Sequence, residues 1–149
     1  MPSHTEQVDL PYSPRQVFDL VADIESYPRF LPSVISARIR RRNGDMLWVD
    51  QRVRFALFRV SIATRAVLQA PIRIHIVCQD NPLVRFKQIW TFADNLAGGT
   101  RLRSSTEYEF RAKLMRLALD ATFKDLQRAT MDAFATRARL LYGEGPPPR

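Results

Sequence analysis

Apolar and polar positions recur along the chain with two different periods. Residues 5–10 alternate weakly at every second position and predict a short strand. Ser13 and the proline after it suit the start of a helix. The apolar positions of 14–24 then fall on one face, which predicts an amphipathic helix. Two prolines break the stretch that follows, so residues 27–31 are expected to form only a second, short helical turn.

From 34 to 111 the apolar positions recur at every second residue, and Ile72 and Ile74 are both expected on the apolar face. Turn signals, such as Asn-Gly-Asp at 43–45 and Gly-Gly at 98–99, divide this region into about six strands. Consecutive strands joined by short turns favour an antiparallel meander with one apolar face. The opposite face is rich in arginine, so positive charge is expected to coat the outside of the sheet.

The helical period returns at 113–142, with apolar side chains at spacings of three or four. A helix of about 29 residues would be roughly 43 Å long, and Gly143 is expected to end it, with 143–149 as a flexible tail. No internal repeat or boundary is seen, so 1–149 is expected to be one domain. The order of elements favours an α+β fold in which a twisted sheet wraps around the long helix and encloses an apolar cavity. The proline-stiffened stretch at 26–32 is then expected to be a wall or lid at one end of that cavity.

Composition and charge narrow the class of protein. Apolar residues make up 46% of the 149 positions, as in ordinary globular proteins, and no run approaches the roughly 18 apolar residues that span a bilayer. The first ten residues lack the pattern of a secretory signal, and the single cysteine fits a reducing compartment, so we expect a cytoplasmic protein. Lysine and arginine number 23 against 15 acids, a net charge of +8. That charge either attracts anions such as nucleic acid, anionic lipid or acidic protein, or only keeps the protein soluble.

Residues suited to catalysis are few. His4 and His75 have no metal-ligand spacing, and no phosphate-binding, dinucleotide-binding or serine-nucleophile motif occurs. Cys78 is expected to be a small buried residue rather than a nucleophile. Asp120 is the one acid in an apolar stretch of the long helix, and it is expected to pair at the surface with a basic residue four positions away. The sequence therefore predicts no metal site, no cofactor and no enzyme.

The aromatic residues indicate more about the function than the candidate catalytic residues do. Several aromatic residues are expected on inward faces and form a large aromatic interior: Phe86, Trp90, Phe92, Tyr108, Phe110, Phe123 and Phe134. Such an interior favours a long apolar ligand over a polar one. For each residue taken singly, packing in the core is the alternative. Trp48 is expected to point outward beside Arg52 and Arg54, either to meet a membrane interface or to pack under a loop. The basic run at 37–44 is either a phosphate-binding segment or a solvated strand end.

Three segments resemble a known family: VDLPYSPRQVFDLVADIESYPRFLP (8–32), IWTFAD (89–94) and the stretch from YEFRAKLMR to RLLYG (108–143). They resemble the coenzyme Q-binding branch of the START-like (polyketide cyclase/dehydrase) superfamily, whose bacterial members include a ribosome-association toxin. The resemblance runs from about residue 5 to 143. It implies the helix-grip fold, an antiparallel sheet of six or seven strands around a long C-terminal helix, with two short helices after the first strand. It also implies a hydrophobic tunnel without a fixed catalytic set.

The resemblance also implies roles for particular residues. It gives Trp90 a contact with the ligand, and it places Tyr27, Phe30 and Leu31 in the helix at the tunnel entrance. Gln88 departs from the family, which often has glycine there. The resemblance and the pattern of inward positions together predict the following ligand-binding residues: Tyr27, Phe30, Leu31, Phe55, Trp90, Phe92, Tyr108, Leu119 and Phe123. The predicted surface for an anionic partner consists of Arg38, Arg40, Arg52, Arg54, Arg59, Arg101 and Arg103.

Two functions are left open by the sequence. In the first, the protein binds ubiquinone or another polyprenyl lipid, supports respiratory electron transport as a lipid chaperone, and contacts the anionic inner membrane peripherally. In the second, it is a toxin-like growth regulator that binds RNA of the large ribosomal subunit and blocks subunit association. DNA is not an expected partner. Aromatic polyketide cyclisation is disfavoured, because no inward acid–base pair can be named.

Overall fold

The computed structural model describes residues 3–78, 81, 84–95 and 97–143. In chain order its elements are β1 (Ser3–Leu10), α1 (Pro14–Ala22), the 3₁₀ helix η1 (Ile24–Arg29), β2 (Val34–Asn43), β3 (Met46–Phe55), β4 (Phe58–Gln69), β5 (Arg73–Cys78), β6 (Val84–Asp94), β7 (Thr100–Phe110) and α2 (Lys113–Tyr142). The predicted order of strand, two short helices, meander and long helix is confirmed. Beyond Gly143 the expected tail lies outside the described residues, and the single domain stays a prediction.

The first two helices follow from local sequence signals. Ser13 and Gln16 form a reciprocal capping box, in which the Gln16 N–H donates to the Ser13 hydroxyl at 3.2 Å and the Ser13 N–H donates to the Gln16 side chain at 3.0 Å. The second short helix begins at Ile24 rather than at residue 27, because Pro28 is accommodated inside the 3₁₀ turn instead of starting it. The buried Tyr27 hydroxyl donates to the Val21 carbonyl and so ties η1 to α1.

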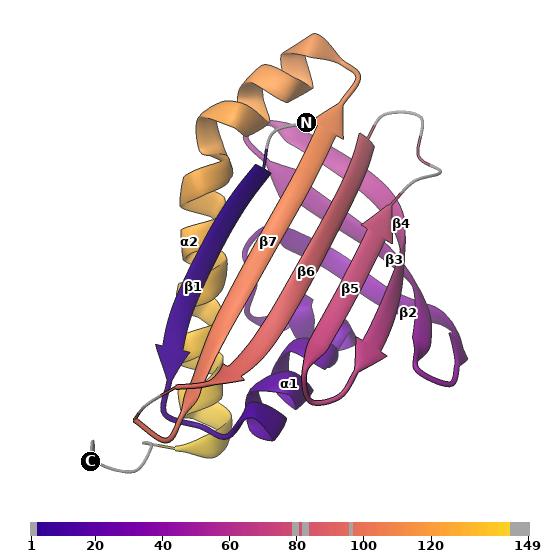
Figure 1. Cartoon of the computed structure of the whole chain (residues 1–149). Coiled ribbons are helices and arrows are strands. Elements are labelled where there is room, and N and C mark those ends of the chain that lie inside the picture. Colours follow the sequence, from indigo (N-terminus) through magenta and orange to yellow (C-terminus); the bar gives the residue numbers. More distant parts are fainter. Residues whose placement is uncertain (1–2, 79–80, 82–83, 96, 144–149) are drawn as a thin grey trace.

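All seven strands form one antiparallel sheet in the order β1-β7-β6-β5-β4-β3-β2. β1 completes the predicted meander by pairing with the last strand along its whole length, from Ser3 opposite Glu107 to Leu10 opposite Thr100. Figure 1 shows the sheet coiling about α2, with β2, β3 and β4 crossing at a steep angle behind β1 and β7. We call the face toward α2 the inner face and the opposite one the outer face.

α2 buries one stripe of side chains against the inner face of the sheet: Leu119, Phe123, Gln127, Met131, Phe134 and Ala138. Gly143 ends the helix with a φ of 77° and donates its N–H to the Arg139 carbonyl at 2.8 Å. The same end is tied to the rest of the fold, because Tyr12 donates to the Gly143 carbonyl at 2.5 Å and Tyr142 donates to the Gln16 carbonyl at 3.0 Å. The other end begins after Ala112, which makes no side-chain capping bond.

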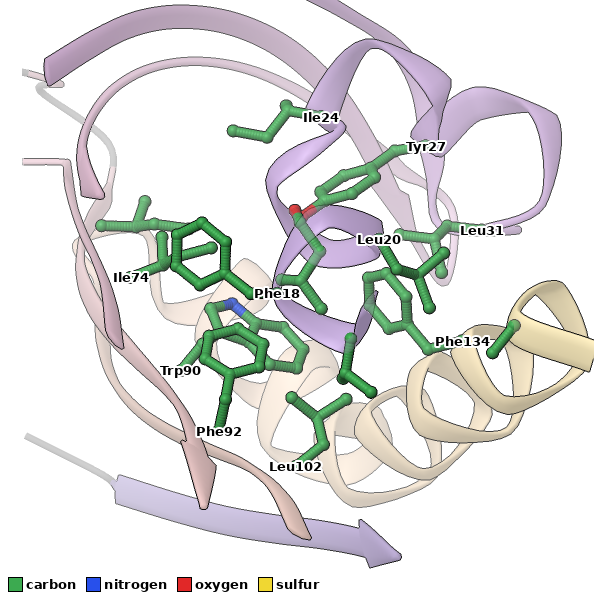
Figure 2. Packing of buried hydrophobic residues seen from close by; sticks show 14 of the residues in the cluster. Phe18, Leu20, Ile24, Tyr27, Leu31, Ile74, Trp90, Phe92, Leu102 and Phe134 are labelled. Atoms are coloured by element: carbon green, nitrogen blue, oxygen red, sulfur yellow. The ribbon is translucent and has the colours of Figure 1, made fainter. Parts of the chain in front are cut away.

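The buried side chains form two clusters at opposite ends of α2. The larger one joins α1 and η1 to the sheet and to the second half of α2, as Figure 2 shows around Phe18, Trp90, Phe92 and Phe134. The smaller one includes Phe55, Val60, Tyr108, Phe110, Leu119 and Phe123, at the end where α2 begins. The space between the helix and the sheet is therefore packed at both ends.

One expected inward position is wrong. Ile72 is 62% exposed, because β5 begins only at Arg73 and Ile72 belongs to the turn before it, where its N–H donates to the Gln69 carbonyl at 2.7 Å. Ile74, one alternation further along the strand, is buried as predicted. Within the described ranges, no helix is long and apolar enough to cross a bilayer.

Candidate functional site

A cavity of about 180 Å³ lies between the inner face of the sheet and α2. It is lined by side chains from η1, from β3 to β7 and from α2, and most of them are aromatic or aliphatic. Tyr27 and Leu31 form the wall nearest the two short helices, which fits the expected role of the stretch at 26–32. The cavity lies between α2 and the sheet and shares side chains with both core clusters, such as Trp90 of the larger one and Phe123 of the smaller one.

The Tyr27 side chain is part of the wall and stays uncharged. Burial, and then the nearby Asp23 carboxylate, raise the pKa of Tyr27 far above its ordinary value. Its hydroxyl is occupied by the Val21 carbonyl. Tyr27 therefore presents its ring to the cavity as an apolar surface and offers no ionisable group.

Seven of the nine predicted ligand-binding residues line this cavity: Tyr27, Leu31, Phe55, Trp90, Tyr108, Leu119 and Phe123. Phe92 is not among the lining residues, because α1 covers that part of β6 and the Phe92 ring packs against Phe18 at 5.1 Å. Phe30 also lies outside the lining, since its ring packs against Phe134 at 5.4 Å and lies under the Arg137 guanidinium at 5.3 Å. These two positions lie outside the cavity lining, and a ligand contact by any of the nine stays a prediction.

Three glutamines, Gln51, Gln88 and Gln127, make the cavity less uniform than the sequence suggested. Gln88 lies on the floor, where its amide nitrogen contacts the Ser104 hydroxyl at 3.0 Å and the Thr106 hydroxyl at 3.2 Å. Gln127 lines the cavity from α2 and is only 8% exposed. The sequence signal for Gln127 was its place in the apolar stripe, four residues after Phe123. The cavity therefore combines a mostly apolar wall with three amide groups.

Tyr108 places a hydroxyl near the cavity, but it does so as part of a pair with an acid on α2. The hydroxyl donates to Asp120 Oδ1 at 2.9 Å. Burial, followed by this hydrogen bond, raises the pKa of Tyr108 to about 12. The expected pairing of Asp120 with a basic neighbour on its own helix is wrong, because in the part of the chain that the structure describes Asp120 accepts from Tyr108 and joins none of the ion pairs. The partner of Asp120 is a tyrosine on β7, and the pattern of residues along the helix does not show it.

Trp90 fills the centre of the molecule. It is 3% exposed and its ring meets Phe134 edge to face at 5.4 Å. Its Nε1 has no hydrogen-bond partner within the described part of the chain. Trp90 therefore belongs to both the core and the cavity wall, so its substitution would change the packing as well as the shape of the cavity.

The outer face carries the predicted arginines, and the structure divides them between distant parts of the sheet. All seven are exposed: Arg38, Arg40, Arg52, Arg54, Arg59, Arg101 and Arg103. Three of them, Arg38, Arg40 and Arg52, line an open groove of about 710 Å³ over β2, β3 and β4. Arg54 and Arg59 lie directly opposite each other on neighbouring strands. Arg101 and Arg103 lie on β7, near the far edge of the sheet.

The groove over β2, β3 and β4, which we call the arginine groove, has mixed chemistry. Arg65 of β4 adds a further cation that the sequence pattern did not single out, and Asp50 pairs loosely with Arg40 at 3.7 Å. Trp48 points outward as predicted but is half-buried, because a bulge in β2 brings the Arg41 guanidinium over its ring at 4.7 Å. The groove therefore combines several arginines with one aromatic surface, in a place that solvent can reach.

Groups that could support catalysis or hold a metal are sparse. His4 pairs with Glu6 at 3.0 Å, His75 lies on another strand, and Cys78 is buried. Within residues 3–78, 81, 84–95 and 97–143, no three histidine, cysteine or acidic side chains come together as metal ligands do. The cavity is thus mostly apolar, with polar side chains at Arg54, at the three glutamines and at the pair of Tyr108 and Asp120.

This arrangement, a sheet gripping a long helix over an apolar cavity, defines a class of ligand-binding fold. Residues 10–135 match the family described as "Polyketide cyclase / dehydrase and lipid transport", and the chain belongs to this family. It is similar to the ribosome association toxin RatA of Escherichia coli strain K12, with 30% identity over 142 residues that cover 95% of this chain and 90% of that protein. The persistence and stress-resistance toxin PasT of Escherichia coli O6:H1 has the same identity and coverage.

Solved structures support the same fold. The Zhui aromatase/cyclase of a Streptomyces species superposes with a TM-score of 0.85 at 18% identity, covering 97% of this chain and 99% of that one. The 18 kDa protein CC1736 of Caulobacter crescentus gives a TM-score of 0.80 at 28% identity, covering 96% and 99%. The helix-grip fold, and the START-like branch that includes the ribosome association toxins, are therefore confirmed.

Proposed function

We propose that the protein binds an apolar ligand in the cavity between the sheet and α2 and acts as a carrier rather than an enzyme. The observation that supports this most is the mostly apolar lining, in which seven of the residues predicted for ligand contact meet. Ubiquinone or another polyprenyl lipid is the ligand class that we propose. The family description, which includes lipid transport, supports a hydrophobic ligand in general.

The size of the cavity limits how such a lipid would bind. A volume of about 180 Å³ is below the roughly 300–1,000 Å³ of pockets that enclose drug-sized ligands. A ring or one to two isoprene units would fit in the cavity, and the rest of a longer tail would have to leave through the opening or widen the space. At about 0.8 kcal/mol for each buried methylene-sized group, one five-carbon unit would contribute roughly 4 kcal/mol before ordering costs.

The test is mass spectrometry of an organic extract from protein purified without detergent. We expect a polyprenyl quinone or a related lipid near one equivalent per chain. Leu119→Trp should remove it, because this residue lines the cavity, whereas Leu140→Trp, on the exposed side of the same helix, should not. Circular dichroism would establish that both variants are folded. A wild-type extract without lipid, or equal lipid in both variants, would contradict the proposal.

A second function, association with the large ribosomal subunit that interferes with subunit joining, is supported by a different observation. The arginine groove places several guanidinium groups and one indole on an open surface, a combination that suits the phosphates and bases of RNA. The relatives named RatA are called ribosome association toxins. Nothing in this surface requires the cavity to be filled, so the two functions are independent.

Sedimentation with purified ribosomal subunits would test the second function. Arg38→Glu with Arg52→Glu reverses two charges inside the groove, and Arg101→Glu with Arg103→Glu reverses two on the same face outside it. If the groove contacts phosphates, the first pair should abolish co-sedimentation and the second should reduce it only slightly. The slope of log affinity against log salt should also fall by about 0.7–0.9 for each phosphate that the variant no longer neutralises. Equal losses in the two double variants would show that only general charge matters.

A further inference from the structure

Three leucines stand exposed at the end of the molecule where α2 begins. Leu57 is 100% exposed in the turn between β3 and β4, and Leu114 and Leu117 are 71% and 54% exposed in the first turns of α2. We call these three residues the apolar tip. The turn that carries Leu57 includes Ala56, whose φ of 49° lies in the left-handed region. Large apolar side chains that protrude together usually mark a contact surface.

The apolar tip lies next to one end of the cavity. Leu57 is flanked by Phe55 and Phe58, which close the hairpin and pack ring against ring at 5.6 Å. The Phe55 ring lies 5.3 Å from Phe110, the residue that ends β7 shortly before α2. Phe55, Phe110 and Leu119 also line the cavity. The exposed leucines are thus continuous with the apolar lining through a layer of aromatic rings.

Cations surround the apolar tip. Arg54 and Arg59 flank the hairpin, and Arg111, Lys113 and Arg116 lie at the start of α2, all of them exposed. Acids near the tip in the described ranges include Glu109 at the end of β7 and Asp120 one turn further along α2, the latter hydrogen-bonded to Tyr108. An apolar centre with a basic rim is the chemistry that an anionic bilayer surface complements, because leucines enter the acyl region while cations meet the headgroups.

The two ends of α2 are attached to the rest of the fold in different ways, because the first turns pack in the smaller cluster and Asp120 accepts a hydrogen bond from Tyr108. The end near Gly143 is held by hydrogen bonds from Tyr12 and Tyr142, whereas the start of α2 follows Ala112 without a side-chain cap. In Figure 1 these two ends of α2 lie at opposite extremes of the molecule. A shift of the first turns of α2 would open the cavity on the side of the apolar tip and leave the larger core cluster intact.

We propose that the apolar tip docks on an anionic lipid bilayer and so brings the end of the cavity against the membrane from which the ligand is taken. This inference rests on the proposed binding of an apolar ligand. It places the membrane contact at the end of the molecule, where Arg54 and Arg59 lie, and not on the arginine groove or on Arg101 and Arg103. A lipid tail that passes from the bilayer into the cavity along this route would meet mostly apolar side chains, such as Phe55, Phe110 and Leu119.

The test is flotation with vesicles of phosphatidylcholine alone or mixed with phosphatidylglycerol. Wild-type protein should float with the anionic vesicles and much less with the neutral ones. The double variant Leu57→Asp with Leu114→Asp should lower the partition coefficient of the protein between the anionic vesicles and water at least tenfold. The matched control, Ile72→Asp with Leu140→Asp, changes two residues that are 62% and 74% exposed away from the apolar tip and should float as the wild type does.

The outcomes separate docking from ligand binding. The tip variant should still bind a prenyl quinone added from ethanol, while losing the ability to extract it from vesicles. If wild type floats but never holds lipid, the cavity proposal fails and docking stands. If the tip variant floats as well as its control does, or if wild type does not float at all, docking is wrong. A wild-type dimer that becomes monomeric only in the tip variant, without flotation, would show that the tip binds a second copy instead.

Discussion

Replacing Phe134 by alanine should destabilise the protein by about 3–5 kcal/mol, the usual loss for a large aromatic side chain in a well-packed core. Phe134 is fully buried, and its ring meets those of Tyr27, Phe30 and Trp90 edge to face at 5.6, 5.4 and 5.4 Å. Such ring pairs contribute roughly 0.5–1.5 kcal/mol each beyond the burial of area. The change removes a side chain that contacts both Tyr27 of η1 and Trp90 of β6, so we expect the upper part of the range.

The measurement is urea unfolding followed by tryptophan fluorescence and by circular dichroism. A loss of about 4 kcal/mol corresponds to a fall in Tm of roughly 8–16 °C for a domain of this size. Leu140→Ala, an exposed residue on the same helix, is the control and should change stability by less than about 0.5 kcal/mol. A loss below about 1 kcal/mol for Phe134→Ala would refute the reasoning, because it would mean that the three ring contacts do not hold the helix to the sheet.

Three further changes test single interactions. Tyr27→Phe should cost about 1–3 kcal/mol in urea unfolding, because the buried Val21 carbonyl loses its donor; an unchanged midpoint would argue against this hydrogen bond. Gln88→Leu removes an amide from the cavity, so it should weaken the binding of a prenyl alcohol about tenfold but leave the binding of the matching hydrocarbon unchanged. Fluorescence titration would measure both affinities, and equal effects on the two ligands would contradict a polar contact. Burial, then nearby Lys and Arg charges, lower the pKa of His75 below 6.5. The folded state therefore binds this proton less readily than the unfolded state, and stability should fall as the pH drops below about 6.5. His75→Gln should make that fall shallower, and identical pH profiles would count against the assignment.

The order of elements and most of the inner face were predictable from the sequence, because both depend on local signals. The period of two from 34 to 111, the period of a helix from 113 to 142, and Gly143 after it each specify a structure that the chain adopts. Phe55 and Tyr108 line the cavity because strand alternation turns them to the inner face, and Leu119 and Phe123 do so because helical spacing puts them in the buried stripe of α2. The other three, Tyr27, Leu31 and Trp90, were expected from the family resemblance.

The remaining features depend on contacts between distant segments. Phe92 has the inward pattern of a lining residue, but α1 covers it through Phe18. The partner of Asp120 is a tyrosine on a strand, although basic residues were available on its own helix. Periodicity shows which side of an element a residue occupies, but it does not show what lies opposite, and these two cases differ from expectation for that reason.

The pairing of β1 with β7 has a consequence for how the chain reaches its native state. Thr5 and Ser105, which face each other across these strands, are 100 positions apart. Strand pairs between such distant segments form late, since the entropy of closing a long loop must be overcome first. During synthesis the edge of β7 can be covered only after nearly all of the sheet has left the ribosome, and α2 follows later still. We therefore expect folding to be slow for a protein of this size, with an exposed apolar sheet face until α2 docks, and assistance by a chaperone should raise the yield of native protein.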